Sequence, residues 1–357
     1  MLLSTSSSND RLPTGHWLSV WIGVIIIALF FIVFFEIKMR QLGWVPSVVD
    51  SKELWADERR KVSDLGDKAI ILVGSSRIQL DVDLGIVKEM SHLQPVQLAI
   101  DGSPFYPVLE SLANDKNVTG TVILSVTMPK VMTQKKARAS EWVGYYNSQL
   151  KNEAPYKIIN NKIRSFLNQN MVTRLEGATP ATVILSLAFQ QKTLGNYLVT
   201  HWDRSRDADY QKVVMPQFYA MRLQRHYGKK LINKAVSFQE FFNIYQQAIG
   251  KIKKRSVNKP KFLEGINRLK KMVNKIEQRG GRVFLVRFPS DKLIWEIDRG
   301  YYPKESFWSV LETNFKNTIH FEDYSSLKQF NLPDGSHLDF RDKKQFTRAL
   351  MDKVYMH

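Results

Sequence analysis

The residues best suited to chemistry are a serine early in the chain and a histidine close to its end. Ser76 closes a Gly-Ser-Ser turn that directly follows the apolar run 69–73. His337 stands in the motif Asp-Gly-Ser-His-Leu-Asp, three residues after Asp334. An acid in that position can bind one imidazole nitrogen while the other nitrogen faces a nucleophilic hydroxyl. The two motifs together predict a nucleophile (Ser76), a general base (His337) and an orienting carboxylate (Asp334).

Each motif has a simpler explanation when it is considered alone. Gly-Ser-Ser is also a common turn from a strand into a helix, in which a serine caps the helix. Among the seven histidines, His337 combines a nearby acid with a glycine-containing loop. His201, in His-Trp-Asp, is the main rival, and we interpret it as part of a surface turn. The pairing of the two motifs therefore carries the prediction.

Apolar runs that alternate with stretches of helical spacing predict the scaffold that positions these residues. Strands are expected at 69–74, 96–100, 121–126, 282–288 and 318–321, and helices at 83–92, 105–116, 262–279 and 341–355. This alternation favours an α/β fold of three layers, with a mostly parallel sheet between helices. In such sheets the ligand site lies at the carboxyl ends of the strands, which is where Ser76 is expected.

Three motifs resemble those of the SGNH/GDSL hydrolase superfamily. They are Gly-Ser-Ser-Arg after the first strand, Leu-Ala-Ile-Asp-Gly-Ser at the end of the second, and Asp-Gly-Ser-His-Leu-Asp before the last helix. The likeness covers about 69–129 and 282–357, and it is closest to membrane-anchored bacterial members that take part in alginate O-acetylation and teichoic-acid D-alanylation. It implies a flavodoxin-like sheet, a triad of Ser76, His337 and Asp334, and oxyanion donors in the backbone N–H groups of Gly102 and Ser76.

The chain also departs from the family pattern. Ser75 stands where the family often has aspartate, and the oxyanion asparagine expected after the third strand is missing. The hydroxyls of Thr127 and Ser125 are weak substitutes, and Arg77 beside the nucleophile is a further site candidate. Losing one oxyanion donor lowers a rate by on the order of 10²–10³. Two hypotheses stay open: a serine acyltransferase or esterase, and a non-catalytic, membrane-tethered polysaccharide-binding or assembly protein with the same sheet.

An uncharged stretch of 19 residues, 17–35, is long enough to cross a bilayer, for which a helix needs about 20 residues. A cleaved signal would have a shorter apolar region followed by small residues, whereas Glu36-Ile-Lys-Met-Arg40 follows here. The sequence therefore predicts a transmembrane helix at 17–36. Basic residues flank it on both sides, so charge alone does not orient it. We expect residues 1–16 in the cytoplasm, a juxtamembrane stalk or helix at 37–67, and the SGNH-like domain at 68–357.

The formal charge of +18 is concentrated in one expected segment of that domain, a helical insertion at about 130–281. Between 129 and 281 there are 29 Lys and Arg residues against 9 Asp and Glu, interleaved with aromatics such as Trp142, Tyr145 and Tyr146. The basic clusters at 222–230 and 251–255 belong to this segment. Anionic inner-membrane lipid, an acidic polysaccharide, or simply solvent are the three candidate neighbours of this surface. Nucleic acid is disfavoured because the chain has an expected anchor and lacks a recognition motif.

The absence of cysteine excludes thiolate catalysis, Cys-ligated zinc and iron–sulfur sites. Serine chemistry requires no metal and no cofactor, so none is expected. The leading hypothesis is a single-pass protein of the bacterial inner membrane with a periplasmic domain. That domain would transfer or remove acyl groups, most simply acetyl, on an anionic or neutral cell-surface polysaccharide. The resemblance further implies a polytopic membrane-bound O-acyltransferase as partner.

Overall fold

The computed structural model describes residues 15–133, 137–152, 155–175, 178, 180–189, 195–213, 243, 257–290 and 292–356. The basic clusters expected at 222–230 and 251–255, and residues 1–14 of the expected cytoplasmic tail, lie outside these residues.

A five-stranded parallel sheet forms the centre of the domain, with strand order β2-β1-β3-β6-β7. The strands are β1 (Ala69–Val73), β2 (Gln94–Gln97), β3 (Thr121–Ser125), β6 (Arg282–Arg287) and β7 (Asn317–His320). The central strands β1 and β3 are buried along their whole length, because helices cover both faces of the sheet. The predicted α/β class with a parallel sheet is confirmed.

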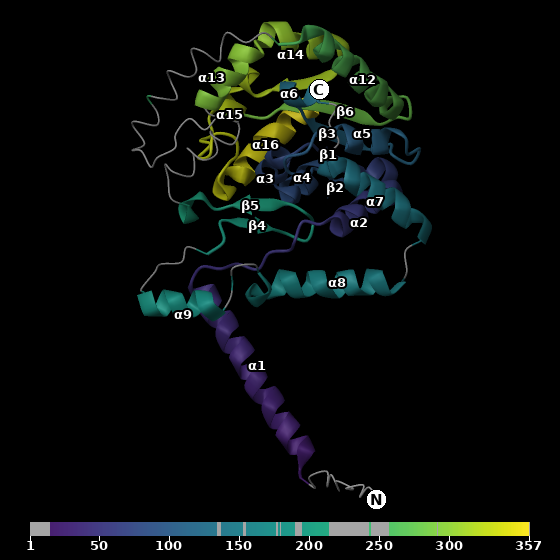
Figure 1. Cartoon of the computed structure of the whole chain (residues 1–357). Helices are drawn as coiled ribbons and strands as arrows, with labels where there is room; N and C mark the ends of the chain where they lie inside the picture. The colour runs from purple at the N-terminus through teal and green to yellow at the C-terminus, as the bar shows by residue number, and fades with distance from the viewer. Residues whose placement is uncertain are drawn as a thin grey trace, which may run out of the picture.

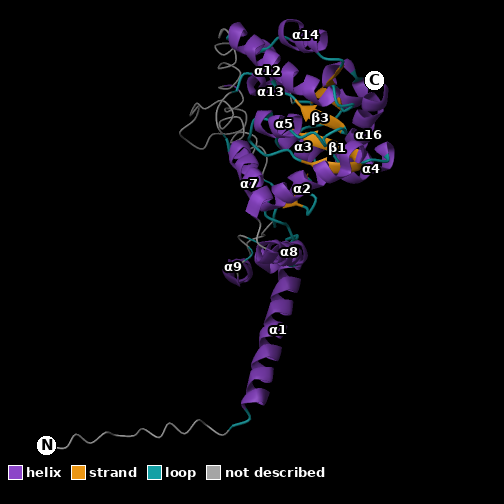
Figure 2. Cartoon of the chain, turned by 90° about the vertical axis from the view of Figure 1, so that its right-hand side faces the viewer, coloured by secondary structure: helices purple, strands orange, loops and turns teal. Residues whose placement is uncertain are grey.

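Alternate residues of each strand enter two separate cores, one on each face of the sheet. In β1, Ile71 and Val73 pack into the first core, whereas Ile70 and Leu72 pack into the second. The first core is covered by α2 (Lys52–Leu65), α5 (Tyr106–Ala113), α7 (Arg138–Asn152), α12 (Lys259–Glu277) and α14 (Lys304–Asn314). The second is covered by α3 (Ser76–Asp81), α4 (Leu84–Ser91), α13 (Lys292–Tyr301), α15 (Ser325–Lys328) and α16 (Phe340–Met356). Figure 2 shows the strands enclosed between these two layers.

The juxtamembrane stalk or helix expected at 37–67 contains a helix, α2, that packs against the sheet of the domain. Trp55 is completely buried, and its indole Nε1 donates a hydrogen bond to the carbonyl of Leu98 at 3.0 Å. Arg59 is buried as well, 2.9 Å from the Asp115 carboxylate and with its guanidinium 5.0 Å from the ring centre of Tyr146. The many charges of this helix suggested a solvated stalk, although one of its faces packs against the sheet.

The segment 130–281, expected as a basic helical insertion within the domain, is mostly helical in the part that the structure describes. Its helices α7 and α12 are layers of the main domain, and α6 (Met128–Val131) follows β3 directly. Trp142 and Tyr146, which the sequence suggested as part of a basic aromatic face, are buried in the first core, and Tyr145 packs against it. The second expected strand, 96–100, is also shifted, since β2 spans Gln94–Gln97. Residues 98–100 continue beside β1 as extended chain, with the N–H groups of Leu98 and Ile100 bonded to the carbonyls of Leu72 and Gly74.

Among the described residues one long apolar helix, α1 (Trp17–Gln41), extends away from the domain (Figure 1). It is long and apolar enough to cross a membrane, as a membrane anchor or a signal sequence would be. None of the residues in its most apolar stretch of 18 is buried. Near its C-terminal end, α8 (Pro155–Asn170) and α9 (Pro180–Phe189) lie across its direction (Figure 1). The two-stranded antiparallel sheet of β4 (Leu198–Thr200) and β5 (Arg206–Ala208) lies between this level and the main domain.

Candidate active site

The turn between β1 and α3 presents Ser76 at the carboxyl end of the sheet. Gly74 ends the strand with φ +152°, and a Cβ added there would lie 2.7 Å from Cβ of Ser125 on β3. A side chain at position 74 would therefore force the ends of the two strands apart. Ser76 then begins α3 and is half-buried, so its hydroxyl is within reach of a substrate.

The structure brings together the three residues that the sequence predicted for nucleophile, base and acid. Ser76 Oγ lies 2.8 Å from Nε2 of His337, and Nδ1 of His337 lies 2.7 Å from Oδ2 of Asp334. A carboxylate only accepts hydrogen bonds, so Nδ1 carries the proton and Nε2 is free to accept from the serine hydroxyl. His337 and Asp334 are buried, whereas the serine is half-exposed.

Asp334 also fixes the loop that carries the histidine. Its Oδ1 accepts hydrogen bonds from the backbone N–H groups of Ser336 and His337, each at 2.9 Å. Gly335 permits this tight turn with φ +80°. The hydroxyl of Ser336 lies 3.1 Å from Nδ1 of His337, so it is a further polar neighbour of the imidazole. One carboxylate thus orients both the imidazole ring and its backbone.

A second buried acid, Asp81, lies behind the histidine loop and was missed by the sequence analysis. Its Oδ1 accepts the backbone N–H of Leu338 at 2.9 Å, which ties the end of α3 to this loop. Burial raises the pKa of the Asp81 carboxyl to about 7. Its other oxygen has no hydrogen-bond partner among the described residues. The apolar neighbours Leu80 and Val82 are the sequence signal that an acid is buried here.

The loop after β2 carries Gly102, which the resemblance suggested as an oxyanion donor. The N–H of Ile100 bonds to the carbonyl of Gly74 at 3.2 Å, so this loop runs beside the turn that holds Ser76. Gly102 adopts φ +68° in the turn. The backbone N–H groups of Gly102 and Ser76 are without an acceptor among the described residues.

Two basic residues, Lys130 and Arg77, lie in the short helices α6 and α3 that follow β3 and β1. Lys130 follows β3, where the expected oxyanion asparagine is missing. Nζ of Lys130 donates to the carbonyl of Gly102 at 3.0 Å, and burial, together with the nearby Arg77, lowers the pKa of this lysine. Arg77 donates to the Ser290 hydroxyl at 3.2 Å, in the loop that follows β6. The sequence analysis singled out Arg77 but missed Lys130, which follows β3 within α6 and is recognisable as the nearest basic residue after that strand.

Among the described residues, the remaining site candidates from the sequence do not join the hydrogen-bonded group of Ser76, His337 and Asp334. Thr127 precedes α6 and is half-buried, and its hydroxyl has no hydrogen-bond partner among the described residues, while Ser125 is buried at the end of β3. Ser75 precedes α3, and in the described structure its side chain makes no hydrogen bond to the triad. His201, directly after β4, pairs with Asp207 of β5 at 2.7 Å.

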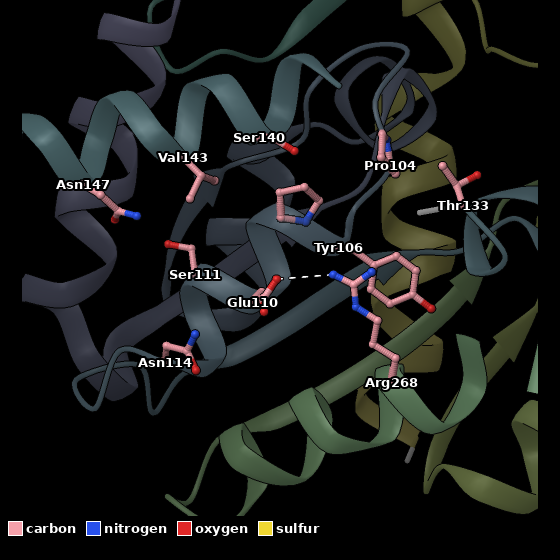
Figure 3. A pocket seen from close by; sticks show the side chains of 11 residues that line it. Pro104, Tyr106, Glu110, Ser111, Asn114, Thr133, Ser140, Val143, Asn147 and Arg268 are labelled. Atoms are coloured by element: carbon pink, nitrogen blue, oxygen red, sulfur yellow. Dashed lines mark hydrogen bonds and ion pairs between the residues drawn. The ribbon is translucent and has the colours of Figure 1, made fainter. Parts of the chain in front are cut away.

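A cavity on the side of α5 does not contain the triad, but two of its lining residues follow Gly102 and Lys130 closely in the chain. It is a groove of about 440 Å³ between α5, α7 and α12 (Figure 3). Pro104, two residues after Gly102, and Thr133, three residues after Lys130, belong to its wall. The other residues along it are mostly polar: Tyr106, Pro107, Glu110, Ser111, Asn114, Ser140, Val143, Asn147 and Arg268. Arg268 pairs with Glu110 at 3.3 Å, as Figure 3 shows.

Comparisons with known proteins add no family to this picture. No protein-family model matches the chain, and a search of curated proteins found no match. What stands is an α/β domain with a five-stranded parallel sheet, a fold that is compatible with hydrolase-like enzymes. At the carboxyl end of that sheet lies a hydrogen-bonded serine, histidine and aspartate.

Proposed function

We propose that this protein is a membrane-anchored serine acyltransferase or esterase that acts on acyl groups of a cell-surface polysaccharide. The observation that carries the proposal is the continuous hydrogen-bonded chain from Ser76 Oγ through His337 to Asp334. A half-exposed hydroxyl on a buried, correctly oriented imidazole is the arrangement required for nucleophilic attack on a carbonyl.

The chemistry proceeds in two halves. Nε2 of His337 takes the hydroxyl proton as Ser76 Oγ attacks the acyl carbonyl, and the ester C–O bond breaks as the leaving oxygen takes that proton from His337. The product of this half is acyl-Ser76. A sugar hydroxyl or water then gives its proton to His337 and attacks the acyl carbonyl. The bond between the acyl carbon and Ser76 Oγ breaks, and Oγ takes the proton back from His337, which restores the serine. Asp334 stabilises the imidazolium in both halves.

The oxyanion of each tetrahedral intermediate is stabilised by the N–H groups of Gly102 and Ser76. Lys130 supports this role, since its ammonium is bound to the carbonyl of Gly102 and adds positive charge at this loop. Cationic groups placed where negative charge develops are a recognised means of stabilising such intermediates. In this proposal Lys130 replaces part of the function of the missing asparagine.

The polar groove supports a carbohydrate as substrate. Its volume of about 440 Å³ falls in the range of ligand sites, roughly 300–1,000 Å³. Amide and hydroxyl side chains on α5 and α7 line it, and such groups suit hydrogen bonds with the hydroxyls of a sugar chain. The only charged residues of its described wall, Glu110 and Arg268, pair with each other. Acetyl as the acyl group follows from the resemblance of the three motifs.

The contacts of α1 support a retained anchor rather than a cleaved signal. The carboxylate of Glu36 accepts hydrogen bonds from the backbone N–H groups of Val172 and Thr173, at 2.9 and 3.1 Å. Met39 is completely buried. Cleavage beyond Met39, a few residues after the apolar stretch, would remove these contacts. A polymer-modifying domain belongs outside the cytoplasm, so we place it on the periplasmic side of a bacterial inner membrane. A polytopic membrane-bound O-acyltransferase is the proposed source of acyl groups.

The test is turnover of a chromogenic acetyl ester by the full chain in detergent, with two adjacent serine variants. Ser76→Ala should lose turnover, and it should also lose labelling by a serine-directed fluorophosphonate. Ser75→Ala is the matched control, because Ser75 makes no hydrogen bond to the triad in the described structure. Equal background turnover in all three proteins, together with no labelling of Ser76, would favour a non-catalytic polysaccharide-binding or assembly protein.

A further inference from the structure

The helix α8 carries an exposed apolar face that the proposed chemistry does not use. Ile159, Ile163 and Phe166 are 59%, 55% and 64% exposed. Their spacing of four and then three residues places them on one side of the helix. Three large apolar side chains on one exposed helix face form a surface that water solvates poorly.

The opposite face of α8 is directed at the domain. Arg164, Ser165 and Asn168 line a small cavity together with residues of the segment before α2, of α2 itself and of the β4–β5 turn. These include Ser51, Asp57 and Trp202. Because the polar face looks towards the domain, the apolar face points away from it.

The neighbouring helix α9 has the same character. Its sequence, PATVILSLAF, contains no charged residue, and Ile184 and Leu185 are exposed. The helix contacts α1, and Figure 1 shows α8 and α9 lying across the end of α1. Two short helices with exposed apolar side chains thus meet at one end of the long apolar helix.

Hydrogen bonds and packing fix both helices at the level where the uncharged part of α1 ends. Nη2 of Arg40 donates to the carbonyl of Asn170, the last residue of α8, at 2.9 Å. Met39 packs with Val172 and Ala178, which link α8 to α9. The uncharged stretch of α1 ends at Phe35. In a helix that spans a bilayer, the following turn lies at the membrane surface.

We propose that α8 and α9 form a collar that lies in the headgroup and outer acyl region of the membrane and docks the domain on the bilayer. The lipid is the occupant that fits, because the collar is continuous with the spanning helix. The sequence of α8 contains no acidic residue, and Lys162 directly before Ile163 adds a positive charge, which favours anionic lipid. The inference rests on the proposed retention of α1 as an anchor. It goes further by assigning a membrane-binding role to helices of the domain.

The natural absence of cysteine makes the test clean, because single cysteines can be labelled with an environment-sensitive fluorophore. The full chain is reconstituted in vesicles of phosphatidylcholine and phosphatidylglycerol that contain brominated lipids. Ile163→Cys on α8 and Ile184→Cys on α9 test the collar. Leu29→Cys on α1 tests the anchor. Glu312→Cys is the control, since this residue is exposed and its helix, α14, lies at the end of the domain away from α1 (Figure 1).

The collar predicts that fluorescence at Ile163→Cys and Ile184→Cys falls by about half or more, most strongly with bromines near the headgroups. Leu29→Cys should be quenched by deeper bromines, and Glu312→Cys should not be quenched. Each labelled protein must keep the melting temperature of the parent chain.

Quenching at Leu29→Cys without quenching at the two collar positions would overturn the collar while leaving the anchor intact. Absence of quenching at Leu29→Cys would overturn both. Cross-linking of Ile163→Cys to a second copy or to another protein, in place of quenching, would show that protein rather than lipid covers this face.

Discussion

Asp334 binds two kinds of partner at once, the imidazole Nδ1 of His337 and the backbone of the loop that carries this histidine. Substitution by asparagine separates the two functions. The amide oxygen still accepts the loop N–H groups, but its NH₂ group faces Nδ1 and favours the tautomer that cannot accept the serine proton. We therefore expect Asp334→Asn to fold and to lower kcat for ester cleavage by roughly 10³- to 10⁴-fold.

The control for this prediction is Asp339→Asn in the same motif. Asp339 accepts from the backbone N–H of Tyr210 and pairs with Arg341, outside the triad. Its kcat should stay within about tenfold of the parent chain, since no triad contact is lost. Steady-state kinetics of both variants decide the matter, and equal losses would contradict the assigned role of Asp334.

Asp81 makes a second prediction at this scale, one of stability against pH. Burial raises the pKa of its carboxyl to about 7 in the folded chain, above its value of about 4 in the unfolded chain. Between these values the unfolded chain loses the proton and the folded chain keeps it. This group therefore contributes stability that is fully present below about pH 4 and is lost as the pH rises to 7.

Asp81→Asn keeps an acceptor for the N–H of Leu338 and removes the titration. The free energy of unfolding of the parent chain, relative to this variant, should fall by up to about 1.4 kcal/mol per pH unit across that window. Urea unfolding of both proteins from pH 4 to pH 8 measures the difference. Parallel stability curves would show that Asp81 is already ionised in the folded protein.

The triad could be predicted from the sequence because its signals are local. The serine follows an apolar strand, and the acid precedes the histidine by three residues. Asp81 and Lys130 could not be assigned in this way. Their partners, Leu338 and Gly102, lie 257 and 28 residues away in the chain, and only the folded sheet brings them together.

At the scale of elements, the position of Ser76 depends on how closely β1 approaches β3. Gly74→Ala would place a methyl group 2.7 Å from Cβ of Ser125 and 3.0 Å from Cγ2 of Ile78. We expect this change to cost about 1–3 kcal/mol of stability, as overpacked sites do, and to reduce activity by displacing the serine.

Gly144→Ala on α7 is the matched control, because its added Cβ would meet no atom within 4 Å. In a helix this exchange should be neutral or stabilise by up to about 1 kcal/mol. Thermal unfolding measures both variants. A melting temperature of Gly74→Ala equal to that of the parent chain would contradict the packing argument.

The strands were predictable because helices on both faces force them to be almost continuously apolar. The helix α2 was misjudged for the opposite reason, since its charged residues outnumber the side chains that face the sheet. The buried Arg59 looks solvent-exposed in the sequence, and its pairing with Asp115 appears only in the fold. The end of β2 was misplaced because residues 98–100 are as apolar and buried as a strand.

At the scale of the whole molecule, a chain of contacts connects the segment after α1 to the loop of Gly102. Asp50, in the segment after α1, pairs with the buried Arg204 at 2.8 Å. Arg204 in turn donates to the carbonyls of Gln97 and Ala99, just before the loop of Gly102. Part of the positive charge of the segment 130–281 thus has a structural role, which the sequence did not reveal.

This architecture predicts one orientation in the membrane. With residues 1–16 in the cytoplasm, the carboxyl terminus lies outside. A reporter enzyme that folds only in the periplasm should be active when fused after His357, and a reporter that works only in the cytoplasm should be inactive there. The reverse pattern would contradict the assigned orientation and, with it, action on a cell-surface polymer.

Detection of the acyl-serine intermediate is the most direct test of the proposal that Ser76 acts as a nucleophile. The full chain is mixed with an activated acetyl ester, quenched in acid within the first turnover and digested for mass spectrometry. We expect one added acetyl group on the peptide that contains Ser76, and none on that peptide in Ser76→Ala. Acetylation of the Ser76→Ala peptide to the same extent, or no acetylated Ser76 in a chain that still turns over the ester, would contradict this proposal.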